Sequence, residues 1–147
     1  MPWYGDPDAL DAHARALGAD AEGVRARARS LEASAATMRW QGTAAQAFRA
    51  TVERDAARLH RAATELDEAA AALRAHAEQV RATLAQIRAV ERAVVGWFEA
   101  RARALGDALQ DVAPWGSWSW RPGTLPGSGE RAWLSVAADL RARGVRL

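Results

Sequence analysis

The 147-residue chain contains no cysteine, which excludes a disulfide framework and a thiolate metal site and leaves the redox compartment open. Lysine is also absent, so all 20 basic residues are arginine. The isoelectric point of 10.3 therefore accompanies a formal net charge of only +2. Charges of both signs are interspersed, a pattern more typical of solvated helical faces than of a nucleic-acid groove.

Long apolar runs are missing too. None approaches the roughly 18 residues of a membrane span, and no apolar core follows a basic start as in a cleavable signal peptide. We therefore expect no membrane insertion and a cytoplasmic protein before any export. Proline is absent between Pro7 and Pro114, whereas proline, glycine and serine interrupt the segment from Pro114 to about Gly129.

These breaks predict an all-α protein with two parts. Residues 1–112 form a helical hairpin, with a first helix at about 7–39, a turn at 40–43 and a second helix at about 44–112. Asp6 and Pro7 start the first helix as N-cap and first helical residue, and Thr43 with Gln46 forms a capping box for the second. Residues 113–147 form a tryptophan-rich tail with a short helix at about 130–143.

Both long helices carry the same heptad pattern, in which alanine precedes a larger apolar residue by three positions. In the first helix the alanines are Ala14, Ala21, Ala28 and Ala35, and the larger residues are Leu17, Val24, Leu31 and Met38. In the second the alanines are Ala56, Ala63, Ala70 and Ala77, and the larger residues are Val52, Leu59, Leu66, Leu73, Val80, Ile87 and Val94. Matching seams joined by a short turn predict antiparallel pairing at close approach, and Leu66→Asp is expected to unfold this pair.

The second helix is longer than the first, so part of its apolar surface lacks a cover. The heptad pattern of the second helix shifts by four residues in this part of the chain, so a bend or break near Gly96 or Gly106 is one alternative to a continuous helix. We call this surface the distal stripe, which consists of Val80, Leu84, Ile87, Val94, Val95, Phe98, Leu105, Leu109 and Val112. The candidates for this cover are the tail, through Trp115, Trp118, Trp120 and Trp133, and a second polypeptide, and the two are not exclusive.

No arrangement of residues indicates catalysis, so no enzyme activity, cofactor or metal is expected. The three histidines, at positions 13, 60 and 76, lack the spacing of a metal-binding pair on one helical face. Arg54, Arg58 and Arg61 share a helical face, which reads more simply as a solvated stripe than as a phosphate site. A structural or polyanion-binding helical protein is the alternative function that these arginines support.

The sequence of the turn between the two helices is similar to a known family motif. The stretch from Trp40 through Gly42 lies between the matched helices and is followed by the segment TAAQAFRATV. Over about residues 4–90 the chain resembles the WXG family of small type VII secretion proteins, whose hairpins pair as four-helix dimers. The resemblance implies export by a membrane ATPase machine as a folded dimer, or escort of a larger effector to that machine.

The resemblance therefore implies a co-secreted partner, targeting adaptor or chaperone. Its partner would be a second copy, a paralogous hairpin or the N-terminal region of a larger type VII substrate, and a secretion ATPase is a further candidate. The family's Tyr-x-x-x-Asp/Glu signal after the second helix is missing, because Trp97 and Phe98 are followed four residues later by Arg101 and Ala102. A hairpin turn needs Gly42 but no tryptophan, so Trp40 is either a recognition contact or a plug for the end of the bundle.

Overall fold

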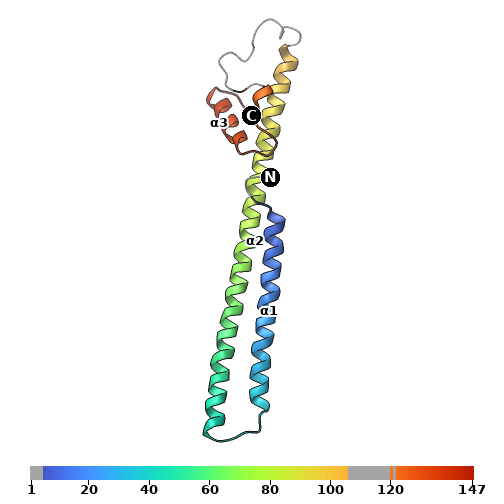
Figure 1. Ribbon diagram of the computed structural model, residues 1–147. Coiled ribbons are helices and arrows are strands. Elements are labelled where there is room, and N and C mark those ends of the chain that lie inside the picture. The colour runs from blue at the N-terminus through green and yellow to red at the C-terminus, as the bar shows by residue number, and fades with distance from the viewer. Residues whose placement is uncertain (1–4, 106–119, 121) are drawn as a thin grey trace. The chain divides into compact units, whose positions relative to one another are not determined.

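A computed structural model describes residues 5–105, 120 and 122–147 (Figure 1). The described elements are α1 (Pro7–Thr37), α2 (Thr43–Leu105), the 3-10 helix η2 (Pro122–Thr124) and α3 (Ala132–Ala142). No strand occurs among these residues, and the predicted all-α fold is confirmed. The predicted end of the second helix at 112 lies outside the described residues.

The starts of α1 and of α2 follow from local chemistry. As predicted, the Asp6 carboxylate caps α1 by accepting from the Asp8 N–H at 2.9 Å. The predicted capping box is wrong: α2 already includes Thr43, and the Gln46 N–H donates to the Gly42 carbonyl at 3.1 Å. Gly42 has a φ of +106°, a backbone conformation that glycine adopts without strain, and this makes it the residue that turns the chain into α2.

The chain divides into two compact units. In the first, Asp6–Glu78, α1 and the N-terminal part of α2 run side by side in opposite directions (Figure 1). All eight alanines of the two predicted seams are buried, with exposed fractions of 8% or less. Because alanine is short, it lets the two helix axes approach closely, and we call this row of buried residues the alanine seam.

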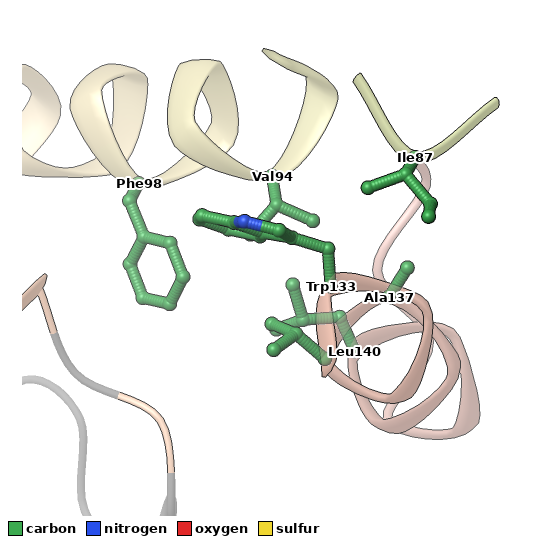
Figure 2. Packing of buried hydrophobic residues seen from close by; sticks show 7 residues of the cluster. Ile87, Val94, Phe98, Trp133, Ala137 and Leu140 are labelled. Carbon is green, nitrogen blue, oxygen red and sulfur yellow. The ribbon is translucent and has the colours of Figure 1, made fainter. Parts of the chain in front are cut away.

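The second unit contains the described residues from Gln79 onward, together with Gly5. Here α3 packs against α2 through a cluster of buried residues (Figure 2). The cluster consists of Ile87, Val94, Phe98, Trp133, Val136, Ala137 and Leu140. α2 continues as helix through Gly96, so the break considered there is not found. This packing against α3 offsets the roughly 1 kcal/mol that a helical glycine costs.

None of the described helices combines the length and the apolar character that crossing a membrane requires.

Candidate functional site

The connection between α1 and α2 presents a large aromatic side chain to solvent. Trp40 is 49% exposed, and its ring lies 6.2 Å from that of Phe48, which is 39% exposed. The two rings are tilted by 51°, within the range of favourable edge-to-face contacts. Trp40 therefore lies against α2 on one side and is open to a ligand on the other.

Arg49 fixes the path of this connection. Its Nη2 donates to the carbonyl of Trp40 at 2.8 Å and to the carbonyl of Met38 at 3.3 Å. α1 has no basic residue in its last turn, so the guanidinium of Arg49 also places a cation at the negative end of the α1 dipole. The sequence reasoning missed Arg49, although a signal was present: Arg49 precedes Ala56 by seven residues, so it occupies a seam position where the next heptads have alanine.

One flank of the alanine seam is closed by polar contacts between α1 and α2. Arg25 donates to the Asp67 carboxylate and also pairs with Glu22 at 2.8 Å. The hydrogen bond to Asp67, and to a smaller extent that to Glu22, raises the pKa of Arg25 above its ordinary value. One heptad along, His60 Nε2 lies 3.4 Å from a Glu32 oxygen.

One heptad from Arg25 in the opposite direction, the Arg74 guanidinium of α2 lies beside Gly18 of α1, 3.8 Å from where a Cβ at Gly18 would be. Apart from Glu22, each residue named on this polar flank directly follows a large seam residue, in α1 as in α2. The polar residues of this flank therefore recur every seven positions along each of the two antiparallel helices.

The opposite flank is apolar and open. We call it the open face, and it consists of large seam residues that are half-buried or exposed: Leu17, Val24, Leu31, Met38, Leu59, Leu66 and Leu73. Leu31 is 42% and Met38 44% exposed, and with Trp40 and Phe48 they are the exposed large hydrophobic residues of the described chain. Exposed apolar side chains that share one face of a helical pair are typical of a protein-binding surface.

The distal stripe has a different environment. Val80, Ile87, Val94 and Phe98 are buried, and Leu84 and Val95 are half-buried. Leu105 ends α2, and Leu109 and Val112 lie outside the described residues. Of the four tail tryptophans, Trp133 is buried and Trp120 packs against the cluster, while Trp115 and Trp118 lie outside the described residues.

One hydrogen bond within the tail and another from the tail to α2 help to position α3. The Trp133 indole Nε1 donates to the Gly127 carbonyl at 2.8 Å, and the Gly129 N–H donates to the Glu91 carboxylate at 3.0 Å. Figure 2 shows the indole of Trp133 lying between α3 and the residues Val94 and Phe98 of α2. For Ile87, Val94 and Phe98, the chain's own tail therefore provides the cover.

The arginine stripe is engaged locally. Arg54 donates to the Ala50 carbonyl and to Thr51 Oγ1, and Arg58 pairs with Asp55 at 3.2 Å. These contacts use part of the hydrogen-bonding capacity that a phosphate group would need.

Residues 3–113 match the family model described as "Putative T7SS secretion signal domain". Comparison with curated proteins and with solved structures finds no match.

Proposed function

The chain belongs to the T7SS secretion signal domain family, and from this premise we propose that it works without enzymatic activity, by pairing its helices with those of another protein. The matched residues 3–113 include all of α1 and α2, so the family assignment covers the open face and Trp40. It makes the protein type VII secretion-related. The proposal adds the role of co-secreted partner, targeting adaptor or chaperone for a larger substrate.

The open face supports this pairing. Its leucine, valine and methionine side chains keep part of their surface in water, and covering them with a second helical pair would be favourable by roughly 25 cal/mol per Å² of apolar area. A second copy, a paralogous hairpin and the N-terminal hairpin of a larger type VII substrate all offer this geometry. The apolar row with polar residues beside it is typical of such helix-to-helix recognition.

Trp40 supports a second contact, at the end of the two-helix unit. The resemblance to the WXG family places Trp40 and Gly42 on that family's motif, and the exposed indole is the type of residue that dominates binding energy at interfaces. We propose that Trp40 contributes to recognition during export, with the secretion ATPase as a candidate receptor. The missing Tyr-x-x-x-Asp/Glu signal would then be supplied by the partner.

The test is Trp40→Ala in cells that carry a type VII system. Because the indole makes its main contact with Phe48 at the surface, the helical circular dichroism is expected to stay unchanged. Export, measured as protein in the medium relative to the cell pellet, is expected to fall about tenfold, the equivalent of ~1.4 kcal/mol of recognition energy.

The matched control is Gln41→Ala, the exposed neighbour in the same connection, which should be exported normally. Loss of helical signal in Trp40→Ala would instead make Trp40 a structural plug. Normal export of a folded Trp40→Ala protein would refute its role in recognition.

A further inference from the structure

We call residues 38–49, which connect α1 to the first turns of α2, the tip. We propose that the tip is recognised by a protein pocket that is apolar at its centre and carries carboxylates at its rim. This inference rests on the recognition role proposed for Trp40, and it goes further by naming the chemistry of the site that receives the indole. It starts from the distribution of charge along the first unit.

The tip is the cationic part of an otherwise acidic unit. Between Glu32 and Glu53 the sequence has two arginines, Arg39 and Arg49, and no aspartate or glutamate. The rest of Asp6–Glu78 has eight arginines and twelve carboxylates. The first turn of α2 also lacks an acidic residue, so no side chain there offsets the positive end of the helix dipole. An acidic ligand would therefore meet a favourable charge at the tip and a net unfavourable charge over the remainder of the unit.

Arg39 is the arginine of the tip that is available to a partner. It is exposed, and within the described part of the chain its guanidinium makes no hydrogen bond or ion pair. Arg49, by contrast, is half-buried and donates to the carbonyls of Met38 and Trp40. The residue directly before Trp40 thus offers a positive charge next to the exposed indole. A carboxylate matches a guanidinium through two parallel hydrogen bonds, so it is the protein group that best fits Arg39.

The apolar side chains of the tip indicate what the centre of the contact contains. Met38, Trp40 and Phe48 are 44%, 49% and 39% exposed, and they are three of the four exposed large hydrophobic residues of the described chain. Protein interfaces place aromatic and methionine side chains in their desolvated core and charged groups at their rim. The partner of this tip is therefore expected to combine an apolar pocket with an acidic border.

A bilayer with anionic headgroups offers the same two chemistries, but the geometry of the tip favours a protein. Arg49 restrains the backbone through its hydrogen bonds to the carbonyls of Met38, at 3.3 Å, and Trp40, at 2.8 Å. The ring of Phe48 lies beside the indole at 6.2 Å. A shaped pocket gains affinity from an anchor that is already held in place, because less conformational entropy is lost on binding. A fluid bilayer makes no such demand on the position of a tryptophan.

The test is the export of Arg39→Glu from cells that carry a type VII system, measured as protein in the medium relative to the cell pellet. The helical circular dichroism should not change, because Arg39 pairs with no group in the described part of the chain. Export is expected to fall about tenfold, since the acidic rim would now repel the tip. Arg39→Ala should lower export about threefold, consistent with the modest value of exposed ion pairs. Arg39→Lys keeps the charge and should recover most of the export that Arg39→Ala loses.

The matched control is Arg15→Glu, which makes the same change of charge at an exposed residue of α1 outside the tip and should be exported normally. Normal export of a folded Arg39→Glu protein, or an equal loss in Arg39→Glu and Arg15→Glu, would overturn the acidic rim. The proposed function would survive either result as long as Trp40→Ala still lowers export, so the two failures are distinguishable.

Vesicles separate a protein pocket from a membrane surface. The purified full-length chain is mixed with phosphatidylglycerol vesicles at low salt, and it is expected to sediment with them no more than Arg39→Glu or Trp40→Ala does. Binding of the unaltered chain that both substitutions abolish would assign the tip to an anionic bilayer and overturn the protein pocket.

Discussion

At the scale of single residues, Arg49 connects the start of α2 to the end of α1. Its two hydrogen bonds go to the carbonyls of Met38 and Trp40, which no helix partner satisfies once α1 has ended. Trp40 in turn contacts Phe48, the neighbour of Arg49 in sequence. One guanidinium thus restrains the backbone from which the exposed indole projects.

Arg49→Ala is therefore expected to loosen residues 38–42 without melting the helices. The free energy of unfolding should fall by about 1 kcal/mol, since the lost hydrogen bonds come from a charged group but are exposed to solvent. Urea unfolding measures the stability, and amide exchange of residues 38–42 measures the mobility. Arg54→Ala is the control, because Arg54 bonds only within its own helix turn, and it should change stability by less than ~0.5 kcal/mol. Equal loosening of residues 38–42 in both variants would refute the role of Arg49.

At the scale of the elements, α1 and α2 are held by alanine at the centre of their contact and by larger residues at its edge. Ala63 is fully buried, whereas Leu66 is only half-buried. The expectation that Leu66→Asp would unfold the pair assumed a leucine enclosed in the seam. In the structure a carboxylate at position 66 can reach water, so the physical basis for complete unfolding is missing.

The two positions are thus predicted to separate folding from pairing. Ala63→Leu should destabilise the two-helix unit by about 1–3 kcal/mol, because the added atoms force the helix axes apart. Leu66→Asp should leave most of the helical circular dichroism intact and abolish dimerisation, seen as a monomeric mass by light scattering. If Leu66→Asp unfolds the chain while Ala63→Leu has no effect, the assignment of centre and edge is wrong.

The sequence predicted the helical class because alanine and the larger apolar residues repeat every seven positions over most of α1 and α2. It also identified the eight seam alanines that are now seen to be buried. It did not predict which flank of the seam is closed, because Arg25 and Asp67 are 42 residues apart in sequence and their pairing depends on the register between the two helices. The contact of Arg49 was missed for a similar reason, since it depends on where α1 ends. The sequence does not single out Trp133 among the four tail tryptophans, because the partner of its indole, the Gly127 carbonyl, is set by the fold of the tail.

At the scale of the whole molecule, the two units differ in how their apolar surface is covered. In Asp6–Glu78 the open face keeps Leu31 and Met38 more than two-fifths exposed. In the other unit α3 covers Ile87, Val94 and Phe98 within the same chain. The proposed pairing with a second helical hairpin would therefore add stability to the first unit, whereas α3 packs on α2 within a single chain.

This difference predicts that protein concentration changes the stability of only one unit. Raising the concentration to ~100 times the dimer dissociation constant should stabilise the paired state by about 2.7 kcal/mol, so amide exchange should slow across α1 and across residues 43–78 of α2. Exchange in α3 should not change, because opening of a segment reports its own local stability. Trp133→Ala serves as the control: it should speed exchange in α3, whose indole anchor is lost, and leave the concentration dependence of α1 intact. Slowing of exchange in α3 together with α1 would show that association involves the second unit, and the assignment of pairing to the open face alone would then be wrong.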